Sequence, residues 1–146
     1  MELQEIERLV RSTVHPAGEF DVATDLTGDG YLILTLSLIP VPWSDGSPKM
    51  RGRRARITTS GVEAFFLELD SRFVLRDFDW ETEGQRDIIL RMTRLALAYL
   101  RGGGVEGERR GLFGRRHPVF SIDLDRQRFT FDQVKRRRGQ TDPPDR

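Results

Sequence analysis

The sequence predicts an α+β domain: an antiparallel sheet of about five to six strands, with an N-terminal helix and a long central helix packed on one face. Three observations predict it. Two segments carry apolar residues at helical spacing, two others alternate apolar and polar residues, and the chain runs helix, hairpin, loop, strands, helix, hairpin, tail. At 146 residues the chain is expected to form a single domain over 1–134, followed by a basic, disordered tail over 135–146.

The first predicted helix covers residues 2–14. Leu3, Ile6, Val10 and Val14 recur at helical spacing between charged residues, which is typical of an amphipathic helix. The segment from Pro16 to Gly18 ends it.

A hairpin follows, although its turn, "TDLTGDGY", also resembles the opening of a calcium loop. The alternation of "YLILTLSLI" predicts a strand over 31–39, and "GEFDVATDL" before it predicts a partner strand. In a calcium loop beginning at Asp25, position twelve must be a glutamate, whereas Leu36 stands there. The hairpin turn is therefore the favoured interpretation, and no metal is predicted.

Residues 40–55 hold three prolines and are expected to form a long loop that exposes Trp43. Residues 56–81 are ambiguous. A helix over 61–70 would begin with a capping box of Ser60 and Glu63, whereas two strands would turn at 70–72. The strand formers in "RFVLRDF" favour the two strands.

The central helix is predicted over 83–101, with Thr82 and Gln85 as its capping box and Gly102 as its end. The following "GGGVEG" matches a dinucleotide-binding motif in letters only. A helix precedes it where the motif needs a strand, so a helix cap and a loop are expected instead. Beyond it, "PVFSIDLDRQRFTFDQV" predicts a hairpin that turns at Asp125 and Arg126.

Composition limits the function classes. There is no cysteine, which excludes disulfides and thiolate chemistry, and the longest apolar-leaning run has 11 residues, too short to span a bilayer. Since the start of the chain also lacks signal-peptide character, a cytoplasmic protein without membrane contact is expected. Arginine supplies 22 of the 24 cationic side chains, yet the net charge is only +1, which argues against a general polyanion binder.

No catalytic constellation is recognisable, and neither a catalytic residue nor a cofactor is predicted. His15 and His117 each precede a proline, and neither stands at a metal-ligand spacing from another histidine or carboxylate.

Charged clusters are the more informative features. Arginines concentrate at 51–56 and at 109–116, where Phe113 lies among them, while carboxylates surround Trp80, which is itself predicted to be a core residue. Since aromatic and arginine side chains anchor protein interfaces and charged rims speed association, these clusters predict a partner-binding surface. The candidate residues are Trp43, Arg51, Arg53, Arg54, Asp79, Glu81, Phe113, Arg115 and Arg116.

The layout of residues 56–134, in which "LDSRFVLRDFDWETE" runs into a helix and a closing hairpin, resembles the small bacterial α+β immunity proteins of polymorphic toxin systems. The resemblance implies a non-enzymatic protein that binds and neutralises a toxin. The alternative is a nucleic-acid-binding module that uses the arginine clusters, and a third hypothesis is an enzyme of unrecognised type. Another protein is thus the expected partner, with nucleic acid as the second possibility.

Overall fold

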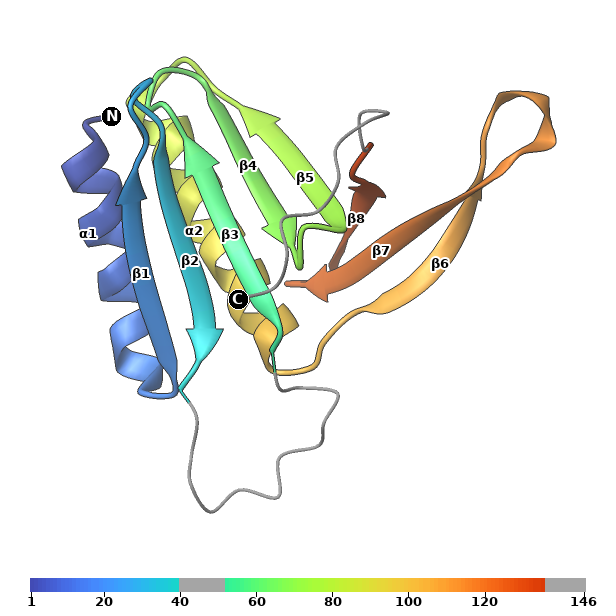
Figure 1. Ribbon diagram of the computed structural model, residues 1–146, viewed down its shortest axis with the longest axis horizontal. Helices are drawn as coiled ribbons and strands as arrows, with labels where there is room; N and C mark the ends of the chain where they lie inside the picture. The colour runs from blue at the N-terminus through green and yellow to red at the C-terminus, as the bar shows by residue number, and fades with distance from the viewer. Residues whose placement is uncertain (40–51, 136–146) are drawn as a thin grey trace.

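The structure is a computed structural model that describes residues 1–39 and 52–135. Within these residues it has two layers: an eight-stranded antiparallel sheet in the order β1-β2-β3-β4-β5-β8-β7-β6, and two α-helices on one of its faces (Figure 1). The α+β class and both helices are confirmed, whereas the predicted count of five to six strands is wrong. The helices are α1 (Leu3–Val14) and α2 (Thr82–Leu100); the strands are β1 (Phe20–Leu26), β2 (Leu32–Leu38), β3 (Arg54–Thr59), β4 (Ala64–Leu69), β5 (Phe73–Phe78), β6 (Val105–Arg110), β7 (Arg116–Leu124) and β8 (Gln127–Gln133).

The additional strands carry weak or absent sequence signals. β3 begins at Arg54, inside the segment predicted as a loop, and β6 replaces the predicted loop after the helix cap. All six residues of β6 are exposed. A strand that is exposed to solvent on both faces has no alternation of apolar and polar residues, so hydrophobic periodicity does not predict it.

The core lies between the sheet and the helices. Alternate residues of β2 to β5 point toward α2, among them Leu34, Ile57, Leu67 and Phe65, each of them fully buried. The predicted stripe of the central helix is also buried: Ile88, Met92, Leu95 and Tyr99. These patterns were readable in the sequence because one face of each element is apolar.

Two tight turns join neighbouring strands with residues in the left-handed region. Asp70 and Ser71 have φ of 50° and 56° between β4 and β5, and Asp125 and Arg126 have φ of 51° and 65° between β7 and β8. Positive φ at both central positions gives the turn twist that suits a two-residue hairpin. The two-strand interpretation of residues 56–81 and the final hairpin are both confirmed.

The capping box predicted at Thr82 is wrong. Glu81 stands at the N-cap of α2 without a side-chain hydrogen bond, and the Gln85 amide donates to the Val62 and Asp79 carbonyls instead of accepting from the N-cap amide. In the described part of the chain, neither helix is both long and apolar enough to cross a membrane.

The C-terminal end of α2 is tied to the sheet by Arg53 and Tyr99. The Arg53 guanidinium donates to the Tyr99 carbonyl at 2.8 Å and lies over the Tyr99 ring, 4.6 Å from its centroid. The Tyr99 hydroxyl donates to the Asp70 carboxylate at the β4–β5 turn. Burial, followed by that hydrogen bond, raises the pKa of the Tyr99 phenol above its ordinary value of 10.0.

Stability should therefore fall at alkaline pH because of Tyr99. Above pH 10 the unfolded chain loses the phenolic proton while the folded chain keeps it, so the free energy of unfolding decreases by up to about 1.4 kcal/mol per pH unit until the folded-state pKa is reached. Denaturant titrations between pH 9 and 12 should show a shallower decline in Tyr99→Phe. The exposed Tyr31→Phe serves as the control. An unchanged slope in Tyr99→Phe would contradict the assignment.

Candidate interaction surfaces

The predicted site residues separate into distinct places. Trp43 and Arg51 lie outside the described residues. Arg53 is engaged within the fold, since its guanidinium binds carbonyls at the end of α2, while the Arg54 side chain is exposed nearby. The other five candidates lie at two surfaces that share no residue.

The first surface is one end of the main sheet, where three connecting segments present exposed apolar side chains. The register aligns them, because Leu26 pairs with Leu32, Leu32 with Thr59, and Thr59 with Phe65. This surface, the acidic end, comprises residues 25–31, 61–64 and 77–83. Its exposed apolar residues are Leu26 (62% exposed), Tyr31 (39%), Val62 (64%), Phe78 (66%) and Trp80 (72%).

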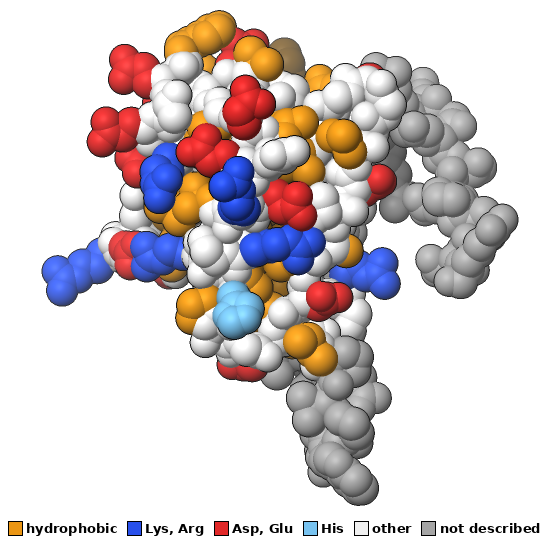
Figure 2. Space-filling model, turned by 90° about the vertical axis from the view of Figure 1, so that its left-hand side faces the viewer, with side chains coloured by type: hydrophobic (Ala, Val, Ile, Leu, Met, Phe, Trp, Pro, Cys, Tyr) orange, Lys and Arg blue, Asp and Glu red, His pale blue; other side chains and the backbone are white. Residues whose placement is uncertain are grey.

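All charged side chains of the acidic end are acidic. Its three segments contain seven carboxylates and no lysine or arginine. One of the seven, Asp77, is paired with Arg91, and the N-terminal ammonium of Met1 lies nearby. Figure 2 shows acidic and apolar side chains together on the upper part of the molecule, with the arginines lower down. The seven are Asp25, Asp29, Glu63, Asp77, Asp79, Glu81 and Glu83.

Gln85 holds two of these segments together. This side chain, only 2% exposed, donates to the Val62 carbonyl at 2.6 Å and to the Asp79 carbonyl at 2.8 Å. It also accepts a 2.9 Å hydrogen bond from the Met1 ammonium. The loop before β4 and the connection from β5 to α2 are therefore fixed relative to each other, which preorganises the acidic end.

The prediction that Trp80 is a core residue is wrong, because its side chain is exposed. Next to it, the Asp79 carboxylate accepts from the Glu81 amide at 2.8 Å and lies against Gly84 in the first turn of α2. The connection therefore turns outward at Trp80 while Asp79 faces the helix. Glu81 is exposed beside it.

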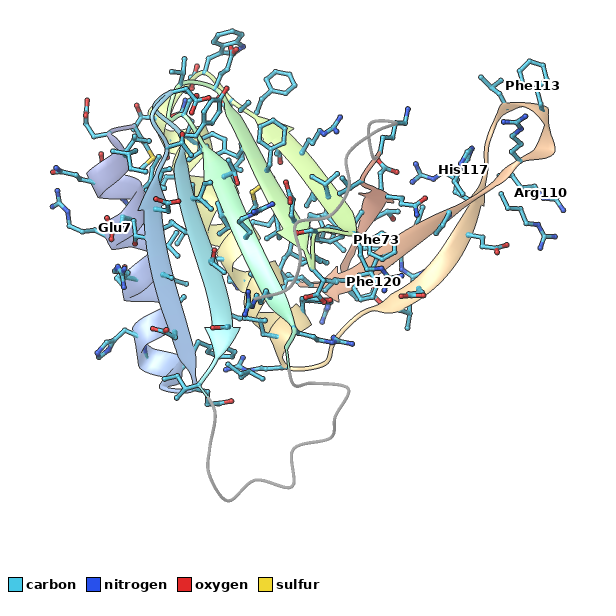
Figure 3. All side chains as sticks on the ribbon, in the orientation of Figure 1. Glu7, Phe73, Arg110, Phe113, His117 and Phe120 are labelled. Carbon is cyan, nitrogen blue, oxygen red and sulfur yellow. The ribbon has the colours of Figure 1, made fainter. Side chains whose placement is uncertain are left out.

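The second surface is a projecting hairpin made of β6, β7 and the turn between them, called the arm below. Phe120 packs at its base, 5.6 Å from Phe73 and edge-on to Tyr99 at 5.4 Å between ring centroids. Beyond that base the hairpin leaves the rest of the molecule (Figure 1), and Figure 3 shows Phe113 and Arg110 at its far end.

The arm tip, residues 109–117, is apolar at its turn and basic on its sides. Leu112 is 86% exposed and Phe113 is 99% exposed. Phe113 has a φ of 70°, a conformation that non-glycine residues adopt at a cost, so the turn holds an aromatic ring in solvent in a strained backbone state. Four arginines and no carboxylate give the tip a formal charge of +4: Arg109, Arg110, Arg115 and Arg116.

Two of the four arginines are free of ion pairs within the described part of the chain. Arg109 lies 3.6 Å from Asp132 and Arg116 lies 3.3 Å from Glu108. Arg110 and Arg115 have no described carboxylate within 4.0 Å. The tip therefore presents guanidinium groups that remain available to a partner.

A groove of ≈ 560 Å³ lies between β5, β8 and the arm, and it extends along the arm to the arm-tip residues Arg109 and His117. Its floor is apolar, with Val74 and Val119, and its polar lining is largely basic. The polar residues are Arg76, Arg109, His117, Asp132, Gln133 and Lys135. Among the described residues no group of three or more His, Asp or Glu side chains is placed to hold a metal ion.

Sequence reasoning found part of each surface. Asp79 and Glu81 lie at the acidic end, and Phe113, Arg115 and Arg116 lie at the arm tip. It missed Leu26, Val62 and Phe78, whose exposure follows from strand pairing between distant segments. No family model, curated protein or solved structure matches this chain.

Proposed function

We propose that this protein acts by binding another protein, and that the acidic end is its contact surface. The observation that carries the proposal is the group of five exposed apolar side chains gathered from three segments. Single exposed apolar residues are ordinary, but several of them gathered at one end of a sheet among carboxylates are typical of an interaction site. Trp80 and Phe78 supply large contact areas with few rotatable bonds.

The carboxylates define the kind of partner. A rim of carboxylates accelerates association with a positively charged surface and disfavours partners that are negatively charged. The partner segment is therefore basic at its border and apolar at its centre. The resemblance to immunity proteins suggests a more specific form of this function, in which the partner is a toxin with that surface chemistry and the contact neutralises it.

A photo-crosslinking amino acid in place of Trp80 tests the proposal in cells of the source organism. We expect one discrete protein adduct that identifies the partner by mass spectrometry. The same crosslinker in place of exposed Arg8 on α1 is the control and should not give that adduct. A nucleic-acid adduct, or the same products from both positions, would contradict a protein-binding role for the acidic end.

A nucleic-acid-binding role is the second candidate, favoured by the arm tip. Phe113 lies among four arginines, an arrangement in which bases stack on the ring and guanidinium groups contact phosphates. The basic lining of the groove extends this surface toward the sheet. Against it stand the 23 carboxylates of the chain, which cancel much of the long-range field.

We expect only weak, non-saturating binding of random DNA or RNA near physiological salt. Fluorescence anisotropy at two salt concentrations measures it. If six phosphates were contacted on duplex DNA, the logarithm of affinity would fall with the logarithm of salt concentration with a slope of about −5. Submicromolar affinity that is lost in Arg115→Ala with Arg116→Ala would promote the nucleic-acid function over the protein-binding one.

A further inference from the structure

We infer that the arm tip of one copy binds the acidic end of a second copy, and that two such contacts form a reciprocal two-fold dimer. This inference rests on the proposed function, since it takes the acidic end as a protein-binding surface and names a second copy of the chain as one protein that it binds. It gives the arm, which the core does not need beyond its base, a role in the same contact.

The first argument is complementarity between the two surfaces. The arm tip carries +4 and two exposed apolar side chains, Leu112 and Phe113. The acidic end carries seven carboxylates around five exposed apolar side chains. Docking one on the other buries Leu112 and Phe113 against apolar side chains of the acidic end and places Arg110 and Arg115, which lack ion pairs among the described residues, against carboxylates. A contact between two copies of the same surface would instead bring like charges together.

The second argument is the placement of the two surfaces. In Figure 1 the acidic end and the arm tip both lie at the upper side of the molecule, one at the end of the main sheet and the other at the end of the arm. A two-fold axis that passes midway between the two surfaces would exchange their positions. Each arm tip then reaches the acidic end of the other copy, and the body of the second copy lies on the opposite side.

The third argument is closure. A head-to-tail contact repeated along one direction produces a filament, whereas the reciprocal arrangement satisfies both surfaces of both copies and stops at two. Two-fold dimers are the commonest closed assemblies of identical chains. The strained turn at Phe113 is also explained, because it places the ring at the outermost point of the arm, where the partner would lie.

Three variants test the dimer, with folding of each verified by circular dichroism. The arm variant combines Phe113→Ser with Arg115→Glu, the end variant is Trp80→Ser, and Arg8→Glu on the outer face of α1 is the control that matches the charge change at Arg115. All four positions are exposed, so the fold should be retained. Sedimentation equilibrium over a concentration series gives the dissociation constant of each.

We expect the unmodified chain and Arg8→Glu to dimerise, and dimerisation to weaken with added salt. The arm variant and the end variant should each dimerise at least about 30-fold more weakly, as for loss of an interface anchor. An equal mixture of the two variants should form a heterodimer through its one remaining intact pair of surfaces, the arm of the end variant on the acidic end of the arm variant.

Three results would overturn the inference: a monomeric unmodified chain, a dimer that either variant retains, or a mixture of the two variants that does not associate. The proposed function fails independently of these outcomes. If the chain is monomeric but the crosslinker at Trp80 captures a different protein, the acidic end keeps its protein-binding role and only the self-association is wrong. Nucleic acid bound by the arm tip of a monomer would assign the arm to the second candidate function.

Discussion

Gly104→Ala is expected to lower the free energy of unfolding by about 3 kcal/mol, the sum of overpacking against an aromatic ring and a strained backbone. Gly104 has a φ of +95°, a conformation that side chains disfavour. A Cβ atom built there would lie 2.2 Å from the Phe120 ring, and that ring is packed between Phe73 and Tyr99. Because the Phe120 ring is buried and held between two other rings, it cannot yield without disturbing them, and the base of the arm should distort.

Gly107→Ala in the same hairpin is the matched control. Its Cβ would lie 3.8 Å from the nearest Val119 atom, an ordinary contact, and β6 is exposed. We expect the stability of Gly107→Ala to stay within about 0.5 kcal/mol of the unmodified chain. Urea denaturation of the two variants measures the difference. Equal stabilities would show that the packing around Phe120 does not constrain the base of the arm.

Gln85→Ala is expected to cost about 3 kcal/mol and to loosen the acidic end. Removal of the amide leaves the Val62 and Asp79 carbonyls without their donor and removes the acceptor of the Met1 ammonium. Each buried polar group left unpaired costs about 1–3 kcal/mol. Hydrogen exchange should quicken first at residues 61–64 and 77–81, because the side chain joins these two segments.

Two further variants define the cause. Gln4 lies on the exposed side of α1, so Gln4→Ala should change the free energy of unfolding by less than about 0.5 kcal/mol. Gln85→Glu keeps the shape and the acceptor for Met1 but places a carboxylate oxygen against two carbonyl oxygens, so it should be destabilised as well. Full stability in Gln85→Glu would show that the two donated hydrogen bonds contribute little.

The sequence by itself determined the elements whose one face is buried. Alternation predicted β2 and the β7–β8 hairpin, helical spacing predicted α1 and α2, and the turn at Asp70 and Ser71 followed from the apolar runs on its two sides. These signals are local, because burial of one face imposes a period on the residues of that same segment. The predicted cluster at the arm was likewise readable, since Phe113 and its arginines are neighbours in the chain.

The tertiary structure decided what periodicity does not encode. β6 is a strand only because β7 pairs with it, and Arg53 binds the end of α2 because β3 passes beside that terminus. Trp80 is exposed because the carboxylate of Asp79, not the indole ring, faces the first turn of α2. The acidic end exists only in the folded chain, where antiparallel pairing aligns the ends of five consecutive strands and brings three short segments, separated by up to some fifty residues, onto one surface. Each segment is unremarkable alone, and it is the register of the sheet, a long-range property, that makes them a site.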